Sequence, residues 1–417
     1  MLLSGMVAVV TAAGLVMAPH PVTGWITENA VPLATIDPAA PVDDLAPLEK
    51  VVGDAPMVGL GESVHDSREE TLLKHRALRY LVEELGFRTI AWEEDWTVGQ
   101  QVNAYIQGRE GDLDALMRRM TRTWRTREVA GVLRWLREYN TAHEDEVEFV
   151  GVEIYATGLS AYDAVRAYVA EHAPARLGAA DRHLKVIRPP SADIGAWART
   201  YFEFDDKRPY IRHARGLYDL VARSGDGGDA HWMVLHEARQ IRSFYEYYAQ
   251  SDMDTYRDAR AAENLRWWRR VSGDKIAYWA ALSHTANAPG QRLQLGPGAP
   301  LSYAAAGSYL RRWYGRGYVS IGFTFTKGRV AAGDVPPPPP EWSDAPLGAP
   351  GSAQYLLDLR RNLTPEAKAW LNAPAEIRVV GRYDPAAPDD FHMTGGTLGQ
   401  WFDAIVHRQT ITPVTPL

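Results

Sequence analysis

Short apolar runs that alternate with helical patterns constrain this chain more than any other feature of its sequence. Residues 57–60 form such a run, a glycine-containing turn follows, and residues 67–85 carry apolar side chains at helical spacing. Gly86 stands where helices commonly end, and residues 89–92 form a second apolar run. A strand, a helix and a strand in this order predict a βαβ unit and therefore a parallel sheet.

The same alternation continues along the rest of the chain. Helical patterns precede a third strand at residues 147–152, and residues from about 158 to 272 are mainly helical. Further strand patterns follow the helical region at residues 276–282, 318–325, 377–380 and 402–406. We therefore predict an α/β fold in which a mostly parallel β-sheet is flanked by helices and carries a largely helical insertion or cap.

Composition excludes several classes of protein. The chain has 417 residues, of which 46% are hydrophobic and 23% charged, which is enough material for a large globular core. Its formal net charge of −7 comes without a basic block, so we expect no nucleic-acid partner. Cysteine is absent, which excludes disulfides, thiolate metal sites and a cysteine nucleophile.

The first 40 residues differ in composition from the remainder. Residues 1–18 are apolar or small and carry no charged side chain, which predicts the core of a signal peptide or an N-terminal anchor and hence a secreted or cell-envelope protein. A buried N-terminal helix is the alternative. Residues 19–41 are rich in proline, alanine and threonine and predict a linker, so the main globular domain is expected over residues 41–417. No later stretch predicts a membrane span.

Titratable side chains follow four of the predicted strands, at the point where each strand ends. Ligands in open α/β sheets bind at the carboxyl ends of the strands, because loops and helix N-termini converge there. The residues at these ends are Glu62 and His65 after the first strand, Glu93 and Glu94 after the second, Glu153 after the third, and His284 after the strand at residues 276–282.

A histidine beside carboxylates suits acid/base hydrolysis. His65 is the candidate general base, and Glu62 is the candidate carboxylate that orients it. Arg68 and Lys74 near the start of the following helix are candidates to stabilise an oxyanion. Ser63 is a weak candidate nucleophile, because the turn lacks the second glycine of a nucleophile elbow.

Other interpretations of the same residues remain open at this stage. The turn could simply cap a helix through Ser63 or Asp66, and the acidic run at residues 93–95 could be a solvated loop. A further alternative is a metal site, with a divalent ion held by Glu62, His65, Glu153 and His284.

Residues 59–65, 68–69, 73–76 and 82–87 together resemble the opening signature of the erythromycin esterase family. Later segments resemble other landmarks of that family, so that the resemblance covers roughly residues 51–413. These segments are residues 90–95, Thr123-Trp124-Arg125-Thr126, residues 149–152, Arg257-Asp258, residues 275–284, residues 321–323 and residues 402–407.

The resemblance implies a hydrolase that adds water to an ester or lactone, such as a macrolide ring, through a histidine base and without a covalent intermediate. By position it implies that His65 is the base and that Glu62, Lys74, Glu93 and His284 are polar active-site residues. The expected partner is a small molecule with an ester or lactone, and no cofactor is expected. The two alternatives are a metal-dependent hydrolase at the same site and a non-catalytic protein that binds a large apolar natural product.

Overall fold

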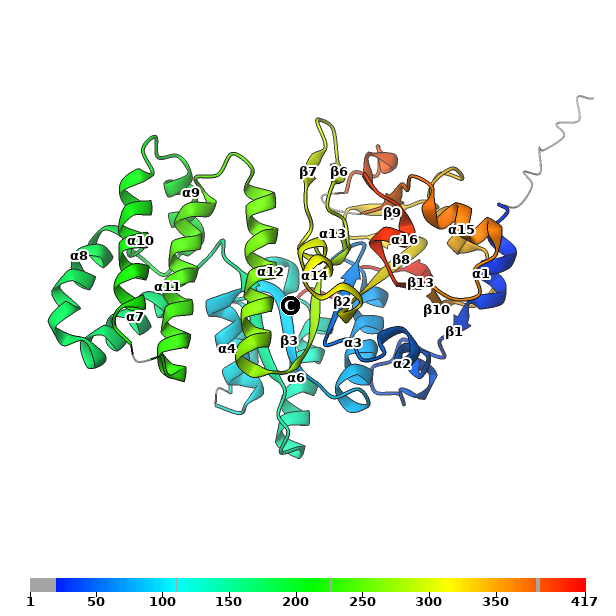
Figure 1. Cartoon of the computed structure of the whole chain (residues 1–417). Helices are drawn as coiled ribbons and strands as arrows, with labels where there is room; N and C mark the ends of the chain where they lie inside the picture. The colour runs from blue at the N-terminus through cyan, green and yellow to red at the C-terminus, as the bar shows by residue number, and fades with distance from the viewer. Residues whose placement is uncertain (1–19, 110, 226, 380–382) are drawn as a thin grey trace, which may run out of the picture.

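The computed structural model describes residues 20–109, 111–225, 227–379 and 383–417. Its main feature is a sheet whose strands run in the order β1-β10-β13-β8-β2-β5-β3-β4, with β9 paired to β8 (Figure 1). The strands are β1 Val31–Pro32, β2 Met57–Glu62, β3 Phe87–Asp95, β4 Glu148–Glu153, β5 Lys275–Ala281, β8 Tyr318–Val330, β9 Gly333–Val335, β10 Gln354–Asp358 and β13 Ala404–Ile411.

The six strands from β13 to β4 are parallel, while β1, β9 and β10 pair antiparallel with their neighbours at the margins. The predicted mostly parallel sheet is therefore confirmed. Its central strands are buried on both faces. Successive side chains of a strand point to opposite faces of the sheet, so neighbouring residues enter different cores. On β2, Val58 and Leu60 enter the core on one face, and Met57 enters the core on the other.

Helices cover both faces of the sheet. One face packs against the core formed with α2 (Pro47–Val52), α3 (Arg68–Glu83) and α6 (Arg127–Ala142), and α4 (Trp96–Ile106) and α5 (Leu113–Met117) add to it. The other face packs against α12 (Met253–Ser272) and α14 (Ala306–Tyr314). The shorter helices near the C-terminal half are α13 Leu282–Thr285, α14 Ala306–Tyr314, α15 Pro365–Asn372 and α16 Leu398–Trp401.

The predicted helical insertion is present between β4 and β5. Its first helices form a core of their own beside the sheet, at the left of Figure 1. The last one, α12, packs on the sheet and on α14, so the insertion is joined to the main sheet. The helices are α7 Leu159–His172, α8 Leu177–Ile187, α9 Ile194–Phe202, α10 Arg208–Ala222, α11 Asp229–Tyr247 and α12 Met253–Ser272.

A second, antiparallel sheet lies above the carboxyl ends of the parallel strands and runs in the order β11-β12-β6-β7. It consists of β6 (Gln291–Leu295), β7 (Leu301–Tyr303), β11 (Ile377–Arg378) and β12 (Phe391–Thr394). The strand predicted at residues 377–380 belongs to this sheet, and its last residue lies outside the described residues. The β6-β7 hairpin, which projects at the top of Figure 1, was not predicted.

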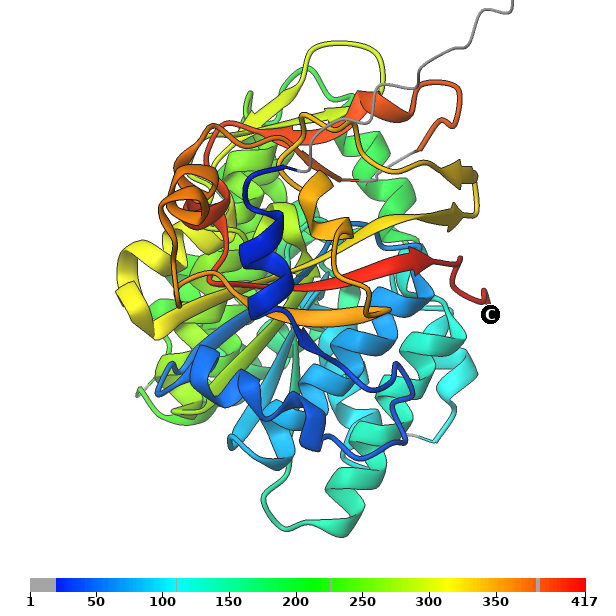
Figure 2. The same ribbon diagram turned by 90° about the vertical axis from the view of Figure 1, so that its right-hand side faces the viewer.

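The linker predicted over residues 19–41 is wrong for the part that the structure describes. Residues Thr23–Asn29 form α1, and Trp25 and Ile26 on this helix are buried against the core beneath α15. Val31 and Pro32 then add a strand to the main sheet, as Figure 2 shows for the blue segment beside β10. Two large apolar side chains therefore anchor a segment whose overall composition resembles a linker.

The signal-like segment at residues 1–18 lies outside the described residues, so export stays a prediction. Among the helices that the structure does describe, none has both the length and the apolar character needed to cross a membrane.

Gly61 allows α13 to approach β2 closely. A Cβ atom added at Gly61 would lie 2.1 Å from Thr285 Oγ1 and 2.6 Å from Leu282 Cα. Gly61→Ala is expected to destabilise the protein by about 1–3 kcal/mol, because the backbone of α13 must move. The comparison is Gly131→Ala in α6, where nothing lies within 4 Å of an added Cβ. That variant is expected to gain about 0.5–1 kcal/mol. If Gly61→Ala and Gly131→Ala unfolded at the same urea concentration, Gly61 would not be needed for the close contact between β2 and α13.

Candidate active site

A small cavity of about 210 Å³ opens where β2, β3 and β5 end. Its wall includes two histidines, His65 and His284, with Glu62, Glu93 and Arg257 beside them. Apolar side chains of the β6-β7 hairpin also line the cavity. The site therefore lies at the carboxyl edge of the parallel strands, as the sequence predicted.

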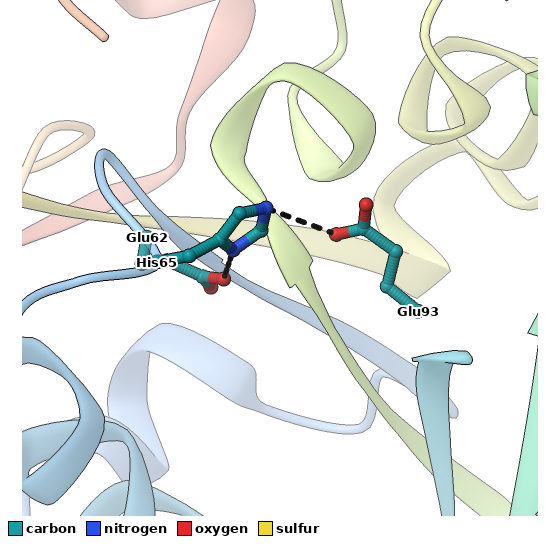
Figure 3. A group of neighbouring side chains, drawn as sticks. All are labelled: Glu62, His65 and Glu93. Atoms are coloured by element: carbon teal, nitrogen blue, oxygen red, sulfur yellow. Dashed lines mark hydrogen bonds and ion pairs between the residues drawn. The ribbon is translucent and has the colours of Figure 1, made fainter. Parts of the chain in front are cut away.

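His65 is held by the turn between β2 and α3. Its Nδ1 lies 2.7 Å from Glu62 Oε1, and its ring packs edge-on against Trp124, with centroids 4.8 Å apart. Glu62 is buried, and its second oxygen accepts a hydrogen bond from Lys74 Nζ. The other ring nitrogen, Nε2, points toward Glu93 across a gap of 4.0 Å, as Figure 3 shows.

Two interactions of the turn explain why it keeps this shape. Ser67 caps α3 by accepting a hydrogen bond from the backbone N–H of Glu70 at 3.1 Å. The Glu70 carboxyl in turn contacts Ser63 Oγ at 2.7 Å and the Val64 N–H at 3.3 Å. Burial raises the pKa of Glu70 to about 8. Ser63 is therefore engaged by this buried carboxyl group, which does not support a role as nucleophile.

Glu93 and Arg257 connect the sheet to the helical insertion. Arg257 on α12 donates to Glu93 Oε1 at 2.8 Å and forms two bonds to Glu153, at 2.7 and 2.8 Å. Glu93 Oε2 accepts from the backbone N–H of Ala281 at 2.9 Å. Three strand ends and the insertion are thus joined by one network of charged hydrogen bonds.

His284 belongs to the same network from the opposite side. Its Nδ1 lies 2.9 Å from Asp258 Oδ1, and this carboxylate also accepts from the Ala306 N–H at 2.9 Å. Its Nε2 lies 3.4 Å from Glu93 Oε1 and 3.3 Å from Arg257 Nη1. Asp258 thereby fixes the orientation of the His284 ring.

Burial and the neighbouring charges shift the pKa values of the titratable side chains that line the cavity. Burial opposes ionisation of Glu93, but the positive charges of His284, His65 and Arg257 hold its pKa well below the usual range. Burial would lower the pKa of His284, yet Asp258 and Glu93 outweigh it and raise this pKa to about 10. Burial also opposes protonation of His65, but the hydrogen bond to Glu62 and the charge of Glu93 leave its pKa raised.

Four of the six predicted site residues meet at the cavity: Glu62, His65, Glu93 and His284. Lys74 lies beneath them, fully buried, bonded to Glu62 and to the Ala280 carbonyl at 3.3 Å. It contacts Glu62 rather than the cavity, so its predicted role at an oxyanion does not fit. Burial lowers the pKa of Lys74 to about 8.

The structure places Arg68 outside the site. Its side chain is 44% exposed and lies 3.9 Å from Glu69 and 3.8 Å from Glu128. Arg68 is the first residue of α3 and faces solvent, whereas Lys74, six positions later, faces the sheet. The predicted role of Arg68 at an oxyanion is therefore wrong.

The acidic run at residues 93–95 is buried, so the solvated-loop interpretation is wrong. Glu94 points away from the cavity and accepts from the N–H groups of Asp95 and Thr121. Sequence reasoning assigned no role to Arg257, Asp258 or Trp124. The only signal for these three residues was their position in segments that resemble family landmarks.

Glu62, His65 and Glu93 also form a group that could hold a metal ion, because one ligand atom from each lies within 4.8 Å of the others. This group shares two residues with the predicted metal set. Glu153, the second carboxylate of that set, is bonded to Arg257. Lys74 and Arg257 already pair with Glu62 and Glu93, so a divalent cation would compete with these two side chains for the carboxylates.

Residues 82–411 match the family model described as erythromycin esterase. The chain belongs to the erythromycin esterase family. Within a segment of 134 residues, this family member is 36% identical to erythromycin esterase type II of Escherichia coli. That match spans 32% of this chain and 32% of the relative's own length.

Solved structures share the fold over nearly the whole chain. A protein from Bacillus cereus has a TM-score of 0.85 at 25% identity, covering 95% of this chain and 98% of its own. A succinoglycan biosynthesis protein has a TM-score of 0.81 at 25% identity, with coverages of 94% and 97%. A His-to-Asn mutant of the erythromycin esterase EreC, in its open conformation, has a TM-score of 0.71 at 16% identity, with coverages of 90% and 96%.

Proposed function

We propose that this protein hydrolyses a carboxylic ester or lactone, with His65 as general base and water as the nucleophile. The observation that carries the proposal is the position of His65: Nδ1 is held by a buried carboxylate, and Nε2 faces the cavity. The gap of 4.0 Å between His65 Nε2 and Glu93 Oε2 is too long for a direct hydrogen bond. In the proposal, the attacking water lies between these two atoms and contacts both of them.

In the proposed reaction, His65 Nε2 takes a proton from water as the water oxygen attacks the carbonyl carbon. Glu62 stabilises the imidazolium that forms. The tetrahedral oxyanion is stabilised by the positive charges of Arg257 and His284, which both line the cavity. The carbon–oxygen bond to the leaving group then breaks, and His65 returns its proton to the alkoxide. No covalent enzyme intermediate is needed.

The family and the relative from Escherichia coli make a macrolide lactone the first substrate to test. The test is mass spectrometry of purified protein incubated with a panel of macrolides and simple esters. A product heavier than its macrolide by one water molecule supports lactone opening, and cleavage of simple esters alone supports the broader hydrolase. A folded protein that binds these compounds without any product supports the non-catalytic alternative.

The pH dependence of kcat/KM reports the state of His65. Only the neutral ring accepts a proton, and Glu62 raises the His65 pKa above 6.5. Activity is therefore expected to rise with pH through a midpoint above 6.5. Glu62→Gln removes the negative charge that favours the imidazolium. The midpoint of the pH profile is therefore expected to move to lower pH, and the value of kcat/KM on the high-pH plateau is expected to fall.

The control for this experiment is Glu84→Gln at the exposed C-terminal end of α3. It is expected to leave the midpoint in place. A midpoint that stays unchanged in Glu62→Gln, or that moves to higher pH, would show that the titrating group is not His65 or that Glu62 does not set its pKa.

We also propose that the reaction needs no metal ion, since Lys74 and Arg257 supply the positive charge beside the carboxylates. Activity is expected to survive dialysis against a chelator. Loss of activity on dialysis, with recovery on adding back a divalent metal, would instead favour a metal-dependent hydrolase at Glu62, His65 and Glu93.

A further inference from the structure

A second, larger hollow continues from the catalytic cavity, and we call it the side pocket. It has a volume of about 800 Å³ and shares Val64, His65 and Leu295 with the catalytic cavity. A molecule whose carbonyl lies at His65 can therefore extend from the cavity of about 210 Å³ into the side pocket. What lines the side pocket bears directly on which substrates fit.

Two arginine side chains line the side pocket. They are Arg122 and Arg125, and Asp66 is the one acidic side chain among its lining residues. The exposed guanidinium of Arg122 has no hydrogen-bond or ion-pair partner among the residues that the structure describes. Arg125 uses only its Nε, which donates to the Met120 carbonyl at 2.8 Å, so both of its terminal nitrogens are available within the described chain.

The wall around these arginines is held in place by backbone hydrogen bonds. The Arg125 carbonyl accepts from the Leu417 N–H at 3.0 Å, and Arg127 N–H donates to the Thr415 carbonyl at 2.8 Å. Thr126 also forms an isolated β-bridge with Pro416. Asp66 is engaged elsewhere, since its carboxylate accepts from the Ala331 N–H. The two guanidiniums therefore extend from a loop whose backbone is held in place, and neither has a carboxylate partner among the described residues.

In the catalytic cavity, by contrast, the two cations that line the wall each have a carboxylate partner in the protein. Arg257 is bonded to Glu93 and Glu153, and His284 is bonded to Asp258. A free guanidinium is a planar donor that matches a carboxylate, phosphate or sulfate. We propose that the side pocket binds an anionic group of the substrate through Arg122 and Arg125. The preferred substrates are then esters or lactones that carry a negative charge beyond the reacting carbonyl.

This inference rests on the proposed hydrolysis for its activity measurement. The probes are para-nitrophenyl monoesters of glutaric, adipic and suberic acid, each with its second carboxyl free or capped as a methyl ester. Sulfonate and phosphonate versions distinguish which anion is preferred. The free acid of the best chain length is expected to have a kcat/KM about tenfold above its capped form, after correction for spontaneous hydrolysis. This ratio is expected to fall as salt is added.

Arg122→Gln and Arg125→Gln are each expected to lower the ratio severalfold, and the double variant is expected to bring it close to one. The control is Arg316→Gln, an exposed arginine outside both hollows, which is expected to keep the ratio. Circular dichroism confirms that each variant is folded. A ratio near one in the folded wild-type protein, or a ratio that the double variant leaves unchanged, overturns the inference.

Calorimetric binding of the corresponding anilides separates this inference from the hydrolytic function, because amides resist turnover. If no ester is hydrolysed but the free-acid anilide binds about tenfold tighter than its capped form, the anion site stands and the proposed hydrolysis fails. If esters are hydrolysed without any preference for the free acid, the hydrolysis stands and the anion site fails.

Discussion

Replacing His65 by alanine is expected to lower kcat/KM for any ester that the protein hydrolyses by about a thousandfold. The reason is that the cavity then lacks a group that can take the proton from water at neutral pH. Glu93 is a poor substitute, since its pKa is held well below the usual range after the opposing effect of burial. The measurement is steady-state kinetics on the same batch of substrate with wild-type and variant protein.

The matched control is His172→Ala, which removes an exposed histidine at the end of α7. It is expected to leave kcat/KM unchanged. His65 lies on a short turn with a partly exposed ring, so His65→Ala is expected to keep the fold, as near-ultraviolet circular dichroism will show. A folded His65→Ala protein with wild-type activity would end the proposed mechanism.

Replacing Lys74 by methionine is expected to destabilise the protein by about 3–5 kcal/mol. Lys74 is fully buried, pairs with Glu62, and lies 4.1 Å above the Trp279 ring. Methionine keeps much of the volume but leaves Glu62 as a buried carboxylate without its cationic partner. Urea unfolding monitored by tryptophan fluorescence measures the change.

A second substitution tests the cause of that loss. Glu62→Gln in the Lys74→Met background removes the unpaired charge, so the double variant is expected to regain more than about 1 kcal/mol. Lys50→Met, at an exposed position on α2, is the control and is expected to change stability by less than about 0.5 kcal/mol. A double variant less stable than Lys74→Met would show that packing around Lys74, rather than the charge of Glu62, dominates.

Both predictions depend on the different positions of the two cations near Glu62 and Glu93. Lys74 acts from below the site and holds Glu62, while Glu62 holds His65. Arg257 acts from the helical insertion and faces the cavity. Loss of Lys74 is therefore expected to lower the stability of the protein first. Loss of Arg257 is expected to lower activity, because it removes a positive charge beside the reacting carbonyl.

The sequence by itself determined the parts of this protein that depend on local pattern. Alternating apolar runs predicted the parallel strands, because strands buried on both faces must be apolar throughout. The contact between Glu62 and His65 also follows from local spacing, since both residues lie on one short turn after β2. The convergence of Glu62, Glu93 and His284 followed from parallel topology, which brings the carboxyl ends of the strands to one edge.

Only the tertiary structure decided which distant groups meet. Arg257 reaches Glu93 across 164 positions of sequence, and His284 reaches Asp258 across 26. Arg68 and Lys74 look equivalent in sequence, yet one faces solvent and the other lies under the sheet edge. Trp25 and Ile26 likewise converted a predicted linker into a packed helix. The periodicity of a segment shows which of its faces is buried, but not which other segment packs against that face. Packing and charge pairing join segments that are far apart in the sequence, so only the tertiary structure shows which of them meet.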